Sequence, residues 1–144
     1  MDNTTKLPIE ENLTPEMLND PAKLSEFIVA ILDSKKARDI KLLHVEKQTV
    51  IADYFVICTG TSRTQVRSLI DEVEYKLGNY GITAFHTEGT DTGIWVLEDF
   101  GSVIIHVFTN DARDKLGSNE RVYYYGVAIN ISEIQNAITE YGRR

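Results

Sequence analysis

The stretch Asp53-Tyr54-Phe55-Val56-Ile57-Cys58-Thr59-Gly60-Thr61-Ser62 decides the fold of this 144-residue chain. Its apolar run is typical of a buried strand, and the run stops at a turn rich in glycine and hydroxyl side chains. Either Thr61 or Ser62 can cap a helix at this point. The apolar side chains that follow recur at helical spacing: Val66, Leu69, Ile70, Val73 and Leu77. The stretch therefore predicts a strand, a tight turn and an amphipathic helix.

Further elements lie on both sides of this unit. Asp20-Pro21 is a capping residue followed by proline at the first helical position, which predicts a helix that ends near Lys36. We expect strands at 40–45, 54–59, 82–87, 94–98, 102–109 and 122–127, a short helix at 112–116, and a final helix from Ser132. The tight corner at 99–101 suits an antiparallel hairpin. The pattern predicts an α+β fold with a mixed sheet of five or six strands flanked by helices.

The chain divides into three parts by composition. Residues 1–19 are acidic, contain two prolines and show little apolar periodicity, so we expect a flexible or loosely docked N-terminal tail with one helical turn near 14–18. Residues 20–117 form the predicted α+β domain. Residues 118–144 are a C-terminal extension of different character, which ends in the expected final helix.

Charge and cysteine content limit the possible functions. Fifteen Lys and Arg against 22 Asp and Glu give a formal net charge of −7, which disfavours direct RNA binding by phosphate neutralisation. No Lys or Arg occurs from Leu77 to Ala112, so this acidic segment is expected to seek a basic protein surface. The one cysteine, Cys58, cannot form an internal disulfide, and no apolar run is long enough for a membrane span. We expect a cytoplasmic protein that does not bind membranes.

A second informative block lies downstream of the first. It consists of Glu88-Gly89, then Trp95-Val96-Leu97-Glu98-Asp99-Phe100-Gly101, then Val103-Ile104-Ile105-His106-Val107-Phe108. With both blocks in this order, the chain resembles the Iojap/RsfS family of ribosomal silencing factors over roughly residues 24–113. After Arg113 the relatives carry an acidic-aromatic tail that this chain replaces with a different sequence.

The resemblance implies both a fold and a function. The expected fold is a trimmed relative of the nucleotidyltransferase fold. The expected function is that of a non-catalytic translation repressor, without a cofactor, which docks on large-subunit ribosomal protein fourteen and sterically stops the small subunit from joining. The partner-binding residues that we expect are Asp53, Tyr54, Glu88, Gly89, Trp95, Glu98, Asp99 and Gly101.

Trp95 is the most informative of these residues. Tryptophan is enriched among residues that dominate interface energy, but it is equally a core aromatic, and the sequence leaves both interpretations open. Strand alternation places Trp95 and Leu97 on one face, and Ile94 and Val96 on the other. In the docking hypothesis Trp95 supplies contact area and the neighbouring carboxylates supply charge pairing.

Two other function classes remain open. A nucleotide-binding enzyme would use the corner at 59–63 for a phosphate, although hydroxyls at a helix start usually only cap it. Glu98 and Asp99 are adjacent and so point to opposite faces, which argues against a metal-binding carboxylate pair. The histidines at 44, 86 and 106 lack ligand spacing, so we expect no metal site, and we interpret His106 as a hydrogen-bonded strand residue and Cys58 as a core residue. The third class is a homodimeric scaffold that pairs through its sheet edge or apolar face.

Overall fold

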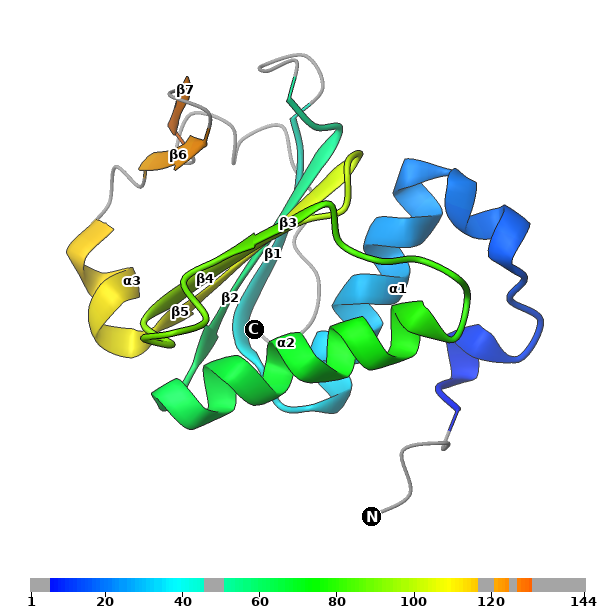
Figure 1. Cartoon of the computed structure of the whole chain (residues 1–144), viewed down its shortest axis with the longest axis horizontal. Helices are drawn as coiled ribbons and strands as arrows, with labels where there is room; N and C mark the ends of the chain where they lie inside the picture. The colour runs from blue at the N-terminus through cyan, green and yellow to red at the C-terminus, as the bar shows by residue number, and fades with distance from the viewer. Residues whose placement is uncertain (1–5, 46–50, 117–120, 125–126, 131–144) are drawn as a thin grey trace.

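A five-stranded mixed sheet is the centre of the structure, a computed structural model that describes residues 6–45, 51–116, 121–124 and 127–130. The strands lie in the order β1-β2-β5-β4-β3, and β2 and β5 are parallel while the other neighbours are antiparallel (Figure 1). Their bounds are β1 Arg38–His44, β2 Tyr54–Gly60, β3 His86–Glu88, β4 Trp95–Asp99 and β5 Val103–Thr109. This arrangement confirms the predicted α+β fold.

Within the described residues, three α-helices accompany the sheet. They are α1 Pro21–Ser34, α2 Arg63–Gly78 and α3 Asn110–Leu116. Helices α1 and α2 lie together on one side of the sheet, and α3 follows β5 on the other side (Figure 1). The caps are those that the sequence predicts, because the Asp20 carboxylate accepts a hydrogen bond from the Ala22 amide and the Ser62 hydroxyl accepts one from the Gln65 amide at 3.0 Å.

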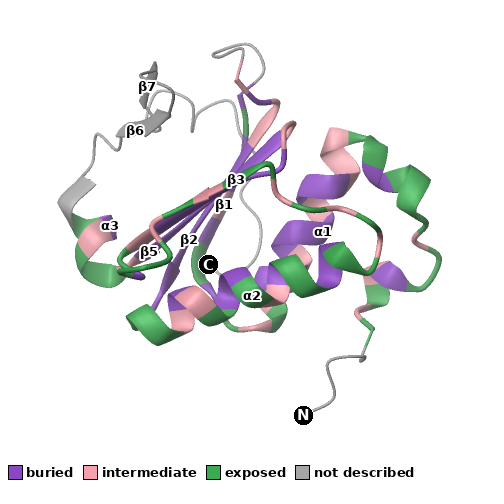
Figure 2. Cartoon of the chain, in the orientation of Figure 1, coloured by how far each residue is buried: buried purple, intermediate pink, exposed green. Residues whose placement is uncertain are grey.

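The core has two parts, one on each face of the sheet, so the described strands are mostly buried (Figure 2). We name the face that α1 and α2 cover the helix face. Its sheet residues include Val56, Cys58, Val96, Ile105 and Val107. The second face carries Phe55, Ile57, Leu97, Ile104 and Phe108, with Trp95 and Ala112 packed at its margin. Burial on both faces explains why the strands read as nearly continuous apolar runs.

The N-terminal residues 6–19 differ from the flexible tail that composition suggests. They form two 3-10 turns, η1 Pro8–Glu10 and η2 Pro15–Asn19, and the second is the helical turn expected near 14–18. Glu10 is only 4% exposed, and its carboxylate lies 2.8 Å from Nζ of Lys76 on α2. The composition did not predict this contact, because a count of charges does not reveal a buried partner 66 residues away. The domain boundaries at 20 and 117 stay predictions.

Two predicted strands also differ. Strand β3 covers only three residues, since the Ile82 amide donates to the Leu77 carbonyl and closes the end of α2 instead of joining the sheet. Where one strand was expected at 122–127, β6 Arg121–Tyr124 and β7 Val127–Asn130 form a separate two-stranded sheet. The expected final helix from Ser132 lies outside the described residues. Among the described segments, no helix combines the length and apolar character that a membrane crossing requires.

Candidate functional site

The eight predicted partner-binding residues do not form one surface. Glu88, Gly89 and Trp95 lie together where β3 ends and β4 begins, and we name these three residues the Trp95 edge. Asp53, Tyr54, Asp99 and Gly101 lie at the opposite end of the sheet, where β2 begins and β4 ends. Glu98 lies on the helix face, beneath α2.

Trp95 is partly exposed and its orientation is fixed. Its indole Nε1–H donates a hydrogen bond to Nδ1 of the buried His106 at 3.1 Å. Its ring centroid lies 5.0 Å from that of Phe108 and 6.0 Å from that of His106, within the range of favourable aromatic pairs. Trp95 is therefore neither a fully buried core residue nor a mobile surface side chain, but an anchored aromatic at the margin of the second face.

Glu88 brings an exposed carboxylate to the same face. In the β3–β4 pairing Glu88 lies opposite Leu97, so its side chain projects on the face that also carries Trp95. Its carboxylate lies 2.7 Å from Nε2 of the exposed His86. Gly89 has a φ of +87°, and a Cβ there would collide with the Trp95 carbonyl oxygen. Glycine is thus required for the close backbone approach at this edge.

The residues at the opposite end of the sheet have structural partners. The amides of Asp53 and Tyr54 both donate to the Ser102 carbonyl, at 2.8 and 3.0 Å. The Asp99 carboxylate accepts a hydrogen bond from the Gly101 amide at 2.7 Å, and Asp99 is only 7% exposed. Gly101 has a φ of +88°, as the tight corner after β4 requires. These contacts hold the corner together, while contact of this group with a partner stays a prediction.

The position of Glu98 differs from the one that the docking hypothesis needs. The docking hypothesis needs its carboxylate at the surface, but the residue is 0% exposed and its Oε2 accepts a hydrogen bond from the Thr87 hydroxyl at 2.9 Å. The cause is strand alternation, which turns Glu98 toward α2 and Asp99 toward the second face. The expected opposite orientation of these two carboxylates is confirmed, and Glu98 does not belong to an accessible docking surface.

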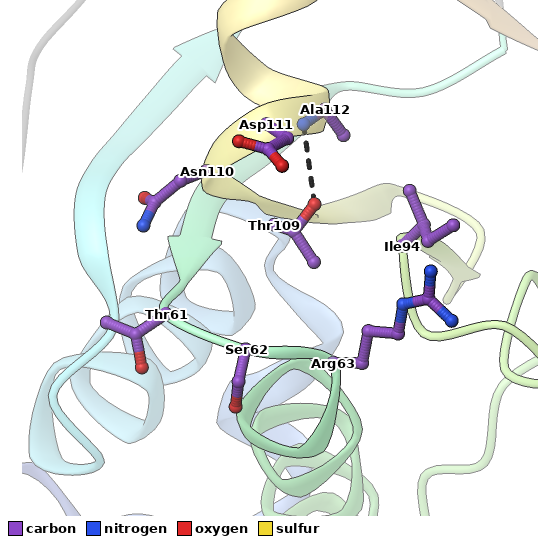
Figure 3. Close-up of a pocket in the computed structure, with 8 residues that line it drawn as sticks. All are labelled: Thr61, Ser62, Arg63, Ile94, Thr109, Asn110, Asp111 and Ala112. Carbon is purple, nitrogen blue, oxygen red and sulfur yellow. Dashed lines mark hydrogen bonds between the residues drawn. The ribbon is translucent and has the colours of Figure 1, made fainter.

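The turn after β2 borders a cavity of about 470 Å³ between the starts of α2 and α3 (Figure 3). Its hydroxyl groups already cap helices. Thr61 Oγ1 donates to Gln65 Oε1 at 2.8 Å, Ser62 accepts from the Gln65 amide, and Thr109 accepts from the Ala112 amide. In the close-up, the Thr61 and Ser62 side chains point away from the α3 side of the cavity. This arrangement agrees with the interpretation of capping rather than with a phosphate cradle.

Two further chemical groups, Cys58 and His106, lie in the core. Cys58 is fully buried, and burial raises the pKa of its thiol to about 12, so it is a core side chain as predicted. His106 is fully buried as well, and burial lowers its pKa to about 3, which keeps the ring neutral. In the described part of the chain, no three His, Cys, Asp or Glu side chains are grouped so as to hold a metal ion.

Comparison with known proteins identifies the family. The model of the family described as "RsfS: Ribosomal silencing factor during starvation" matches residues 18–140. The chain belongs to this family. A ribosomal silencing factor RsfS of Bacillus subtilis is 42% identical over 84 residues, which cover 58% of this chain and 71% of that protein. The resemblance inferred from the two sequence blocks is thereby confirmed.

Two further similarities are to a solved structure and to a mitochondrial protein. A crystal structure from Bacillus halodurans superposes with a TM-score of 0.61 at 33% identity, covering 66% of this chain and 90% of that one. A mouse protein named mitochondrial assembly of ribosomal large subunit protein 1 is 30% identical over 95 residues, which cover 62% of this chain and 40% of that protein. The family thus has the fold described above and is associated with ribosomes.

Sequence reasoning missed the contacts that shape the Trp95 edge. The hydrogen bond to His106 depends on the pairing of β4 with β5, in which Leu97 lies opposite His106 and Trp95 is its diagonal neighbour. Alternation alone places both side chains on one face but does not determine the register. The only available signal was the presence of one polar residue, His106, within an otherwise apolar strand.

Proposed function

We propose that this chain represses translation by docking through the Trp95 edge on a basic patch of large-subunit ribosomal protein fourteen, and so prevents the small subunit from joining. The observation that carries the proposal is an anchored, partly exposed indole beside an exposed carboxylate, that of Glu88. Desolvated tryptophan is a common source of interface energy, and a nearby carboxylate orients a basic partner. Inhibition is steric, and neither catalysis nor a cofactor is required.

The acidic character of this region survives the burial of Glu98 and Asp99. Among the five acidic residues between Leu77 and Ala112, the three that remain exposed are Glu88, Asp91 and Asp111. These charges support a basic protein partner over the phosphates of RNA. The apolar side chains of the second face are buried in the chain itself, so docking relies on its margin rather than on a bare sheet.

Co-sedimentation with isolated large subunits tests the proposal. Wild-type protein is expected in the ribosomal fraction, and Trp95→Ala and Glu88→Lys are expected to remain in the supernatant. Glu16→Lys, which makes the same charge change at an exposed position of η2, is the matched control and should bind like the wild type. If all four proteins sediment equally, the Trp95 edge is not the docking surface.

A subunit-joining assay tests the mechanism. When stoichiometric protein is added before the small subunit, light scattering should show less 70S formation, and Trp95→Ala should restore it. Binding to large subunits without any effect on joining would contradict steric inhibition. Light scattering of the free protein also tests the homodimer prediction, since a dimer through the sheet margin would compete with docking.

A further inference from the structure

A buried carboxyl group lies between the sheet and α2. Glu98 projects from β4 onto the helix face and is 0% exposed. One of its oxygens, Oε2, accepts the hydrogen bond from Thr87 on β3, whereas Oε1 has no hydrogen-bond partner within the described residues. A buried oxygen without a partner is costly, because it has lost its hydration without compensation.

Helix α2 carries two more carboxyl groups near Glu98, those of Asp71 and Glu74. Arg67, Asp71 and Glu74 recur at helical spacing and form one stripe along α2. At one end of the stripe the Arg67 guanidinium donates to the carbonyls of Thr90 and Asp91, at 2.9 and 2.7 Å, which ties α2 to the β3–β4 connection. Further along the stripe lie Asp71 and Glu74, which are exposed on α2. Besides burial, the hydrogen bond and charge of Glu74 and the charge of Asp71 raise the pKa of Glu98.

Ionisation of the fully buried Glu98 carboxyl is unfavourable, and the two carboxyl groups of α2 make it more so unless a cation or a proton compensates. A metal ion is not supported, since the described residues contain no group of side chains arranged to hold one. The described neighbouring elements supply no cation to compensate the charge. Arg67 on α2 already donates to two carbonyls. The neighbour on β3 is the uncharged Thr87, and the residue opposite Glu98 on β5 is the apolar Ile105. The remaining possibility is that Glu98 is protonated, and the proton converts its unpartnered oxygen into a hydrogen-bond donor.

We propose that Glu98 carries a proton at neutral pH and donates it in a hydrogen bond to Glu74, which clasps the β3–β4 edge to α2 and opens when Glu98 ionises. In this state each oxygen of Glu98 has a partner, one on β3 and one on α2. Glu98 is then a positioning residue for the strands that carry Trp95, although it cannot itself touch a partner.

The electrostatics agree with this geometry. Burial, followed by the hydrogen bond to Glu74, raises the pKa of Glu98 from 4.5 to about 9. In the unfolded chain the same carboxyl ionises near 4.5, so the folded state binds more protons between these two values. The stability that the clasp contributes is therefore fully present below pH 4.5 and declines as the pH rises toward 9.

A carboxyl-detected NMR titration of the full chain tests the proposal. One glutamate carboxyl resonance should titrate well above pH 7, and it should vanish in Glu98→Gln, which keeps the shape and a hydrogen-bond donor. Glu74→Gln should lower the midpoint of the same resonance, whereas Glu26→Gln on α1 should leave it unchanged. If every glutamate of the wild type titrates below pH 6, the proposal is overturned, even if the variants fail to fold.

The single tryptophan offers a second readout on the isolated protein. The indole N–H resonance of Trp95 should shift with the same alkaline midpoint in the wild type and stay constant over that range in Glu98→Gln. An indole resonance that is equally insensitive to pH in both proteins would contradict the coupling between the clasp and the Trp95 edge. Because no ribosome is present, these outcomes are independent of whether docking occurs there.

Discussion

Trp95 and His106 are joined by a hydrogen bond that crosses from β4 to β5, with 3.1 Å between the indole Nε1 and Nδ1 of the imidazole. An indole nitrogen can only donate, so Nδ1 must be the unprotonated acceptor and the proton of the neutral ring is on Nε2. The low pKa of the buried His106 keeps the ring neutral at neutral pH, and the hydrogen bond from Trp95 selects its tautomer. The orientation of the proposed contact residue is thus set by a side chain that lies wholly inside the protein.

Replacing Trp95 by phenylalanine tests this bond. The variant retains an aromatic ring but leaves Nδ1 of His106 as a buried acceptor without its donor. We expect the free energy of unfolding in urea to fall by about 1–3 kcal/mol. As a control, Tyr75→Phe removes a polar group from a residue that is 39% exposed, and should change the free energy of unfolding by less than about 0.5 kcal/mol. Equal stabilities of the two variants would show that the hydrogen bond is not significant.

His106 also predicts an acid-sensitive component of stability. Its folded pKa of about 3 lies below the ordinary value of 6.5, because burial disfavours the charged ring. The unfolded state therefore binds more protons between pH 6.5 and 3, and stability falls as the pH decreases through this range. His106→Gln should show a shallower decline in melting temperature than the wild type over this interval. A slope for His106→Gln equal to that of the wild type would argue against this assignment.

Local sequence signals predicted the elements well, and tertiary contacts explain where they failed. Asp20 and Ser62 cap their helices as expected, because capping depends only on residues within one turn. Alternation likewise placed Trp95 and Leu97 on one face and turned Glu98 away from Asp99. It did not reveal that the face that carries Glu98 is covered by α2. Charge made Glu98 look like a surface residue, and the same reasoning predicted a flexible or loosely docked tail for residues 6–19.

Gly89 is expected to be intolerant of even a methyl group. Its φ of +87° is unfavourable for other residues, and a Cβ would collide with the carbonyl oxygen of Trp95. Gly89→Ala should therefore lower the melting temperature by several degrees and also weaken co-sedimentation with large subunits. Gly78→Ala, in the last turn of α2 with nothing within 4 Å of a Cβ, should be neutral or slightly stabilising. A Gly89→Ala protein as stable as Gly78→Ala would contradict the close approach.

The buried pair of Glu10 and Lys76 fastens the N-terminal segment to α2. Their side chains are 3% and 4% exposed, and the Tyr80 hydroxyl donates a second hydrogen bond to the Glu10 carboxylate at 2.9 Å. Burial alone would raise the pKa of Glu10, but hydrogen bonds from the Leu7 amide, Lys76 and Tyr80 outweigh it and lower the pKa. The stability from this carboxylate is therefore present at neutral pH and is lost as the pH falls below the ordinary value of 4.5.

Removing one member of this pair should be far more costly than removing an exposed ion pair. Lys76→Met leaves the Glu10 carboxylate buried beside a methyl group, so we expect a loss of about 3–5 kcal/mol in the free energy of unfolding. Lys23→Met removes the partner of Glu26, a partly exposed pair at 3.7 Å, and should cost no more than about 1 kcal/mol. In the double variant Glu10→Leu and Lys76→Met, no charge is left buried, and part of the loss should be recovered. Guanidinium unfolding of the two single variants and the double variant measures these losses in the free energy of unfolding. Equal losses for Lys76→Met and Lys23→Met would mean that this pair does not fasten residues 6–19.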